Sequence, residues 1–269
     1  MILPVLILVV SLGILGNNYS TFGDFIEKDV SLKGGYSVTV ETEKEFSPSE
    51  VEDMLGGDIS VKKLRSIATG SALGYTIEYG GNNIDSFLNE VESLFEVSEY
   101  SIEEISPAIS QRFWEGTLKA ISVAIIAMSL VVFLYFRKVV PALAIVLSGI
   151  SNIIGTLAAI SLMGISLSAS GIAAILMLLG YSIDSNIVLT ARVMKNKRDS
   201  LEDRITSAVK TGLTMSITSI AALTVLYLTS TAEILKIISL TLIIGLLLDV
   251  LNTWIQNAGI LRMYLERKG

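Results

Sequence analysis

The stretch that decides the fold is IAAILMLLGYSIDSNIVLTAR, which runs from Ile172 to Arg192. Its first eight residues are all apolar, and its 21 residues match the length of about 20 that a helix needs to cross a bilayer. Asp184 and Asn186 nevertheless lie inside it. A carboxylate in hydrocarbon is costly and usually faces a bundle interior or a water-filled path. The stretch therefore predicts a membrane helix whose polar residues serve packing or function.

The composition of the whole chain supports this prediction. Hydrophobic residues make up 51% of the 269 residues, charged residues make up 17%, and the mean hydropathy is +0.64. This apolar excess predicts several membrane spans. The sequence has no cysteine and no histidine, which excludes thiolate and imidazole metal sites and Ser-His-Asp triads within it. It also lacks the glycine spacing of nucleotide-binding loops, so we expect no metal, no cofactor and no nucleic-acid partner.

The apolar stretches divide the chain into three predicted parts. Residues 1–17 are expected to form a first membrane helix, 18–115 an external domain, and 116–269 a bundle of five membrane helices. The first apolar run, Ile2–Leu15, is short, but it lacks the charged start and the A-x-A cleavage site of a signal peptide. A span whose cytoplasmic residues lie outside this sequence is therefore favoured over a signal peptide. The five further apolar stretches are 117–136, 139–162, 168–190, 208–229 and 234–260.

The distribution of charge predicts the orientation in the membrane. Residues 18–115 hold 19 acidic and 7 basic side chains, whereas the rest of the chain holds 7 acidic and 13 basic ones. The basic residues cluster at Arg137–Lys138, Arg192–Arg198 and Arg262–Lys268, which are alternate loops and the C-terminus. The positive-inside rule places these clusters in the cytoplasm. We therefore expect a multi-pass protein of the cell membrane with both termini cytoplasmic and 18–115 external.

Residues 18–115 predict a ferredoxin-like α+β domain between the first two membrane helices, in the order β-α-β-β-α-β. The expected elements are a strand at 34–41, a helix at 47–55, strands at 59–67 and 72–79, a helix at 83–95 and a strand at 97–105. Ser47, Pro48 and Glu50 carry the capping-box pattern of a helix start. For the pair Gly34 and Gly35, which opens the first strand, a close backbone approach and a simple turn both stay open.

The membrane helices carry polar and small residues at helical spacing, which lets helices approach closely and hydrogen-bond. One interpretation is a set of packing seams, within the chain or with a partner, formed by Asn152, Gly155, Gly180 and Gly245. The other interpretation is a proton relay based on the intramembrane carboxylates. A function is favoured for Asp184, whereas both interpretations stand equal for Asp249. The candidate relay residues are Asp184, Asn186, Lys210, Thr214, Thr218, Asp249 and Asn252.

These residues resemble one known family. GYSIDSNIVLTAR is similar, at Gly180, Asp184, Asn186 and Arg192, to the fourth-span motif of the SecD/SecF family of the resistance-nodulation-division superfamily. KTGLTMSITS resembles the fifth-span motif of that family, with Lys210 where arginine is usual. The resemblance covers the whole chain, since a first span, an external ferredoxin-like domain and five closely spaced spans are also the layout of the family.

Two further features indicate the branch of the family. The segment DVSLKGGYSVTV resembles the family's strand after the first span, which makes Gly34 and Gly35 motif residues. The acid of bacterial SecF stands one residue later than Asp184, at the position of Ser185, so this chain departs from the bacterial pattern. This departure and the short external domain favour the archaeal SecF type.

The resemblance implies a membrane subunit that is not an enzyme and that pairs with a SecD-type subunit to assist protein export. Its further partners would be the Sec translocation channel, exported preproteins and the lipid bilayer. In bacteria the pair is thought to couple the proton motive force to motion of the external domains. Six spans would then form half of a twelve-helix, pseudo-symmetric bundle of the resistance-nodulation-division type.

Two other functions stay open on the residues alone. A half-size resistance-nodulation-division exporter of small molecules or lipids would need larger external domains than the 98 residues here. A purely structural translocon assembly factor would use the polar stripes only to pack against a SecD-type subunit. An intramembrane protease is not favoured, because such enzymes carry their aspartates in Y-D and G-x-G-D motifs, whereas Ile183 precedes Asp184 and Leu248 precedes Asp249.

Overall fold

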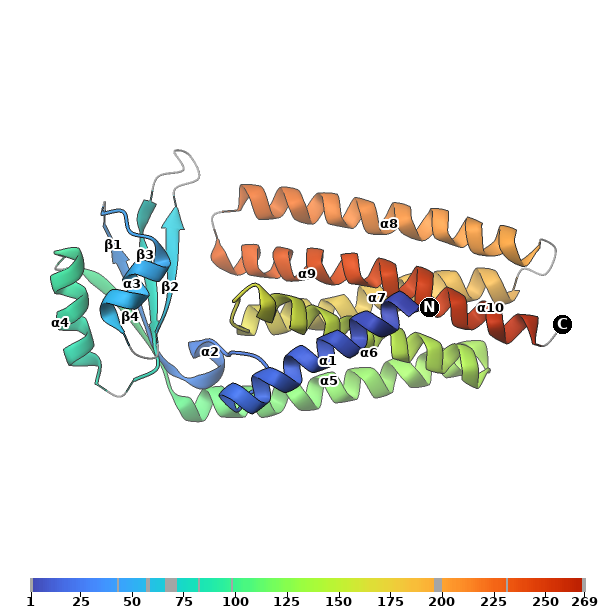
Figure 1. Ribbon diagram of the computed structural model, residues 1–269, viewed down its shortest axis with the longest axis horizontal. Coiled ribbons are helices and arrows are strands. Elements are labelled where there is room, and N and C mark those ends of the chain that lie inside the picture. The colour runs from blue at the N-terminus through green and yellow to red at the C-terminus, as the bar shows by residue number, and fades with distance from the viewer. Residues whose placement is uncertain are drawn as a thin grey trace.

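A bundle of long helices carries a small α+β domain at one end in the computed structural model (Figure 1). The residues that the structure describes are 2–42, 44–56, 59–65, 72–81, 83–97, 99–195, 200–230 and 232–267. The end of the strand expected at 59–67 and the connection to the next expected strand lie outside these residues. The same holds for part of the expected basic clusters, namely Lys197, Arg198 and Lys268.

Six stretches of helix among the described residues are long and apolar enough to cross a membrane. They belong to α1 (Ile2–Phe22), α5 (Pro107–Phe136), α6 (Val139–Leu162), α7 (Ala169–Lys195), α8 (Leu201–Thr229) and a last span that begins with α9 (Glu233–Leu251). The last span continues without a break through η1 (Asn252–Asn257), which is π-helical, into α10 (Ala258–Glu266). The predicted six-helix membrane protein is confirmed.

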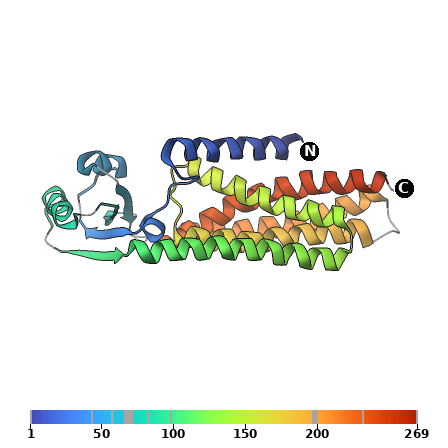
Figure 2. The same cartoon turned by 90° about the horizontal axis from the view of Figure 1, so that it is seen from below.

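The helices differ in how deeply they are buried. In the most apolar 18-residue stretch of α6, 61% of the residues are buried inside the protein, whereas only 11% are buried in the corresponding stretch of α8. Figure 2 shows α1 and α5 at opposite edges of the bundle, and both contact α6. Helix α8 lies along another edge, against α7 and α9 (Figure 1). The centre of the bundle is therefore built by α6, α7 and α9, while α8 presents most of its surface outward.

The α+β domain between α1 and α5, which we call the external domain after its predicted location, is a four-stranded antiparallel sheet with two helices. Its elements are β1 (Gly35–Glu41), α3 (Pro48–Leu55), β2 (Ile59–Arg65), β3 (Ala72–Tyr79), α4 (Ile84–Phe95) and β4 (Tyr100–Ile105). The strand order is β2-β3-β1-β4, and in this register Val38 lies opposite both Ile77 and Ile102. This order confirms the predicted ferredoxin-like arrangement.

Alternating apolar residues of the sheet form the core of this domain together with both helices. Val38, Val40 and Ile77 are completely buried and pack with Val51 of α3 and Val91 of α4. The capping box predicted at the start of α3 is present, since Ser47 and Glu50 hydrogen-bond to each other's backbone N–H groups. These hydrogen bonds hold the pKa of the Glu50 carboxyl below its usual value.

The helices run past the expected domain boundaries at residues 17 and 115. Helix α1 continues to Phe22, and α5 begins at Pro107, whose fixed φ and missing N–H suit a first helical position. At 30 residues α5 is about 45 Å long, which exceeds the roughly 30 Å hydrocarbon core of a bilayer. A short helix that the sequence did not predict, α2 (Val30–Lys33), lies between α1 and β1.

The pair Gly34 and Gly35 joins α2, the sheet and α5. Gly34 has φ +84°, and a Cβ placed on it would lie 2.6 Å from the Pro107 Cα. Gly35 has φ +136°, and its Cβ would lie 2.5 Å from the carbonyl oxygen of Tyr79. The two explanations left open by the sequence therefore hold together, because the backbone turns sharply here and also passes too close to its neighbours for a side chain.

We expect Gly34→Ala to destabilise the protein more than Gly56→Ala. Both glycines end a helix with positive φ and extended ψ, a conformation that costs other residues about 1–3 kcal/mol. Only the Gly34 substitution also meets the Pro107 backbone, and overpacking adds about 1–3 kcal/mol. Thermal unfolding of the purified variants measures the difference. Equal melting temperatures for the two variants would show that the close approach to α5 carries no energy.

Candidate functional site

The segment between α1 and the sheet is hydrogen-bonded to the loop that joins α6 to α7. The Asp29 N–H donates to the Leu167 carbonyl at 3.0 Å, and the Leu167 N–H donates to the Glu27 carbonyl at 2.7 Å. These two bonds form a parallel β-bridge centred on Lys28 and Leu167. Ile26 of the same segment is buried in a hydrophobic cluster with residues of α6 and α7. The external domain is thus connected to the two central helices as well as to its own flanking spans.

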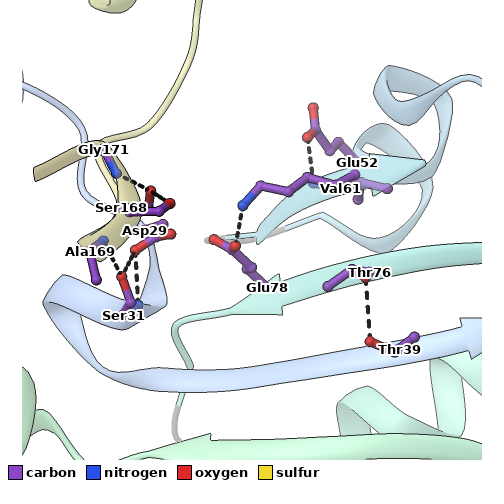
Figure 3. Close-up of polar contacts among 12 residues, drawn as sticks. Asp29, Ser31, Thr39, Glu52, Val61, Thr76, Glu78, Ser168, Ala169 and Gly171 are labelled. Atoms are coloured by element: carbon purple, nitrogen blue, oxygen red, sulfur yellow. Dashed lines mark hydrogen bonds and ion pairs between the residues drawn. The ribbon is translucent and has the colours of Figure 1, made fainter. Parts of the chain in front are cut away.

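Side chains strengthen this junction (Figure 3). The Ser31 hydroxyl donates to the Asp29 carboxylate and accepts a 3.0 Å hydrogen bond from the Ala169 N–H at the start of α7. The Ser168 hydroxyl accepts from the Gly171 N–H, so both serines bind unpaired N–H groups in the first turn of α7. Burial raises the pKa of the Asp29 carboxyl, although its hydrogen bond with Ser31 works in the other direction.

A cluster of polar side chains lies in the middle of the membrane bundle, between α6, α7 and the last span. We call it the buried polar cluster. Each helix contributes one stripe of residues at helical spacing, and none of these side chains is more than 1% exposed. The cluster consists of Ser148 and Asn152 of α6, Ser182 and Asn186 of α7, and Asp249, Thr253 and Asn257 of the last span.

Asp249 receives hydrogen bonds from all three parts of the cluster. Its Oδ1 accepts from the Ser182 hydroxyl at 2.5 Å, from the Thr253 hydroxyl at 3.2 Å and from the Asn152 Nδ2 at 3.4 Å. Asp249 is completely buried, and it makes no ion pair with any residue that the structure describes. Neutral donors alone therefore hold this carboxyl.

Asn186 extends the cluster toward the end of the bundle away from the external domain. Its Nδ2 donates to the Ser182 carbonyl at 2.7 Å and lies 3.4 Å from the Ser148 hydroxyl. Its Oδ1 accepts from the Asn257 Nδ2 at 2.5 Å. Together with the bond from Ser182 to Asp249, these contacts form one continuous chain of polar groups from Asp249 to Asn257.

The π-helical segment η1 explains how the last span presents so many polar side chains inward. A π-turn holds more residues than an α-turn, so neighbouring positions can share the inner face of the helix. Asn252 and Thr253 are adjacent in sequence and both buried, as are Gln256 and Asn257. In a regular α-helix, neighbours in sequence point about 100° apart.

Several atoms in this region are buried without a hydrogen-bond partner among the described residues. Unpartnered buried polar groups are costly, so each of them needs an explanation. They include oxygens of two residues that contact each other, Asp249 Oδ2 and Asn152 Oδ1. The others in this region are Ser151 Oγ, Thr190 Oγ1, Trp254 Nε1, Gln256 Oε1 and Asn257 Oδ1.

Three glycines allow the helices around the cluster to pack closely. A Cβ on Gly155 would lie 3.1 Å from a Leu248 methyl group, and one on Gly245 would lie 2.4 Å from a Leu178 methyl group. A Cβ on Gly212 of α8 would overlap the ring of Trp254, at 1.9 Å. These glycines are packing positions within the chain. By contrast, a Cβ on Gly180 would have no described atom within 4 Å.

A second group of candidate residues lies on the outside of α7 and α8, and we call it the exposed polar face. Asp184 is exposed on α7, and Lys210, Thr214 and Thr218 are exposed on α8, four residues apart and so on one side of the helix. Both threonine hydroxyls bond only to carbonyls of their own helix, at 2.8 Å. Asp184 and Lys210 make no hydrogen bond or ion pair with a residue that the structure describes.

Arg192 connects α7 to α8 near the end of the bundle away from the external domain. Its Nη1 donates to the Ser207 hydroxyl at 2.6 Å and to the Ser207 carbonyl at 3.0 Å. Because the two helices run antiparallel from this contact, Asp184 comes to lie at about the level of Thr214. The last residue of the family-like motif thus fixes the register of the exposed polar face.

The structure divides the predicted relay residues into two groups. Asn186, Asp249 and Asn252 are buried between α6, α7 and the last span, and Asn152, Gly155 and Gly245 pack around them. The exposed polar face holds the other four, Asp184, Lys210, Thr214 and Thr218, and Gly180 is exposed on the same helix as Asp184. A relay between these residues stays a prediction.

Sequence reasoning missed Ser182, Thr253, Asn257 and Gly212 in the membrane bundle. It also missed Asp29, Ser31 and Ser168 at the junction. One signal was present, because Ser182 stands four residues before Asn186 and Thr253 stands four residues after Asp249. Among the described residues, no three His, Cys, Asp or Glu side chains come together as a metal site would require.

Residues 84–267 match the family model for the protein export membrane protein SecD/SecF, C-terminal. The protein-export membrane protein SecF of Pyrococcus furiosus is 36% identical over 271 residues, covering 99% of this chain and 90% of that protein. The SecF protein of Methanocaldococcus jannaschii is 37% identical over 275 residues, covering 98% of this chain and 94% of the relative.

Solved structures share the fold at lower sequence identity. The crystal structure of SecDF from Thermus thermophilus, described as a translocon-associated membrane protein, matches with a TM-score of 0.76 and 18% identity. The match covers 98% of this chain but only 37% of the SecDF chain. A second SecDF structure, in a super-membrane-facing form, matches with a TM-score of 0.66 and 17% identity.

Proposed function

This chain belongs to the SecD/SecF family of protein-export membrane proteins, and we propose that it is a SecF-type subunit that assists Sec-dependent protein export together with a SecD-type subunit. The observation that carries the proposal is the identity with archaeal SecF proteins over nearly the whole chain. The subunit acts by binding and movement and catalyses no reaction. Its further partners are the Sec translocation channel, exported preproteins and the lipid bilayer of the cell membrane.

The exposed polar face supports a SecD-type partner. Asp184 and Lys210 lie on spans, and charged groups directed at lipid are costly. A second set of membrane helices that covers α7 and α8 would remove these side chains from lipid and give them partners. This chain covers only 37% of the SecDF chain that shares its fold. We place the SecD-type subunit against the exposed polar face, where it supplies the missing half of the bundle.

Coupling of export to the proton gradient is the second part of the proposal. Asp184 would exchange protons at the interface with the partner, where Lys210 adjusts its charge state, while the buried polar cluster responds within the chain. The junction between Glu27–Ser31 and the α6–α7 loop gives such a response a route outward, because it bonds the external domain to the two helices that hold Asn152 and Ser182. A movement of α7 against α6 would therefore shift the external domain.

The proposed orientation has both termini and the Arg192–Arg198 loop in the cytoplasm and residues 18–115 outside. The charge asymmetry of the sequence supports it. So does the arrangement of the chain, because both termini lie toward the end of the bundle that is away from the external domain (Figure 1).

A purely structural assembly factor is the second candidate function. Its polar stripes would only pack, and Asn152, Gly155 and Gly245 do pack, although within the chain and not against a partner. It gives no reason, however, for an acidic and a basic residue on the outer surface of two spans. An exporter of small molecules has less support, since the described external elements form a single four-stranded sheet with its helices.

The orientation can be tested with single cysteines, because the native sequence contains none. A membrane-impermeant thiol reagent should label Ser86→Cys, which is exposed on α4, from outside intact cells. It should label Ser200→Cys, exposed at the start of α8, only after the cells are opened. The reverse pattern of labelling would contradict the proposed topology.

The partner surface can be tested at Gly180. A leucine there would add bulk to the exposed polar face, so Gly180→Leu should reduce co-purification of a SecD-type subunit several-fold without changing the melting temperature of the isolated chain. Gly116→Leu is the matched control, because Gly116 lies in an exposed position of α5 with no atom within 4 Å of its Cβ position. Equal recovery of the partner with both variants would place the interface elsewhere.

Proton coupling can be tested at Asp184. Asp184→Asn keeps the size and hydrogen-bonding ability of the side chain but cannot release a proton. We expect it to assemble normally while losing the part of export that depends on an imposed proton gradient, measured in vesicles. Asp184→Glu, which retains the acid, should keep some of that dependence, and Asp53→Asn in the external domain should keep all of it. Gradient-dependent export by Asp184→Asn at the wild-type rate would refute a relay through this residue, and failure to assemble would show a structural role.

A further inference from the structure

The side chains of Asp249 and Asn152 each have one polar atom with a hydrogen-bond partner and one polar atom without a partner among the described residues. The Asn152 Nδ2 lies 3.4 Å from the Asp249 Oδ1, which joins α6 to α9. The other oxygens of the two groups, Asp249 Oδ2 and Asn152 Oδ1, are both buried and both without a partner among the described residues. Each is an acceptor if the acid is ionised, so neither can bond to the other. Two buried acceptors on a single pair of contacting groups call for a donor.

We propose that Asp249 holds a proton on Oδ2 and donates it to Asn152 Oδ1, so that the acid and the amide form a two-bond pair between α9 and α6. A protonated carboxyl has one donor and one acceptor, and a primary amide has the same two functions in the complementary order. One proton therefore satisfies both unpartnered oxygens at once. The pair follows from the geometry, while its use in export rests on the proposed function.

The charged groups around Asp249 favour the neutral acid. Helix α6 and the segment η1 contain no titratable residue, and α1 contains only Tyr19. On α7, Asp184 is exposed and Arg192 is bonded to Ser207 at the end of the helix. On α8, Lys210 is exposed.

The two ends of the last span hold the remaining charges. Glu233 and Lys236 belong to the first turn of α9, on the side of the external domain. The titratable residues of α10, Arg262, Tyr264 and Glu266, and Arg267 after it, begin more than three helical turns beyond Asp249. No described cation faces the carboxyl, and a buried carboxylate without a cation is strongly disfavoured.

The proton would control how tightly α9 is held to α6. Loss of the proton leaves both buried oxygens without a donor and places an unpaired carboxylate between the helices. The contact of Gly155 with Leu248 lies beside this pair and depends on the same close spacing of the two helices. The protonated acid thus holds α6 and α9 together, and deprotonation of Asp249 weakens the contact between the two helices.

Infrared spectroscopy of the purified, full-length protein in lipid vesicles tests the proposal directly. A protonated carboxylic acid has a C=O stretching band separate from those of carboxylates and amides. We expect this band in the wild-type protein at neutral pH, its loss in Asp249→Asn, and its shift in Asn152→Ala, where the O–H loses its acceptor. Asp53→Asn, in an exposed position of the external domain, is the control and should leave the band unchanged.

Stability provides the second measurement. Asparagine at position 249 presents an N–H₂ group where the acid presents its O–H, so an amide–amide pair can replace the acid–amide pair. Asp249→Asn should therefore fold and keep its melting temperature when the pH is raised, whereas the wild-type melting temperature falls. An Asp249→Asn protein that does not fold would contradict the proposed pair.

Two further results would overturn the proposal. One is a wild-type spectrum in which Asp249→Asn removes no acid band. The other is a melting temperature that rises with sodium ions in the wild type but not in Asp249→Asn, because the carboxylate would then be ionised and hold a metal cation. Export is not involved in either measurement. If the acid band is present but export does not depend on the proton gradient, the protonation of Asp249 is supported and only the proposed coupling to export is refuted.

Discussion

A bilayer interior offers no water, so every polar group within it must find its partner inside the protein. This constraint explains the centre of the structure. The three most polar stripes, on α6, α7 and the last span, face one another, and Ser182, Asn186 and Asp249 are bonded among them. The glycines at 155 and 245 bring the helices close enough for these bonds, since side chains there would meet Leu248 and Leu178. The apolar helices α1 and α5 take the edges, where they can face lipid.

The same constraint also applies to the outer side of α7 and α8, where it bears on assembly with another protein. There Asp184 and Lys210 are presented outward and have no described partner within the chain. A surface with an acidic and a basic side chain is costly if it is left to lipid, so this face calls for a further protein to cover it. The need for polar groups to have protein partners therefore applies to the outer surface as well as to the interior. Family membership indicates what kind of protein covers that surface.

Local patterns predicted much of this structure, because hydrophobic periodicity and capping residues act within one element. They located six spans, the β-α-β-β-α-β order and the capping box at Ser47. They could not decide which face of a helix points inward. Asp184 and Asp249 both stand in apolar surroundings, yet only Asp249 is buried, because the packing of α6, α7 and α9 determines it. The docking of Asp29 on Leu167 was equally out of reach, since it joins segments more than 130 residues apart.

The π-helical turn also affects how the last span can change in evolution. A π-turn arises when one residue is inserted into an α-helix, so this span carries one residue more than a regular helix would need. Deletion of one residue between Asn252 and Asn257 would restore regular winding and turn α10 by about 100° relative to its present setting. Leu261, now completely buried, would leave the interior. The number of residues in this span therefore determines which side chains of α10 face inward. It also determines the direction in which the charged residues of α10 point.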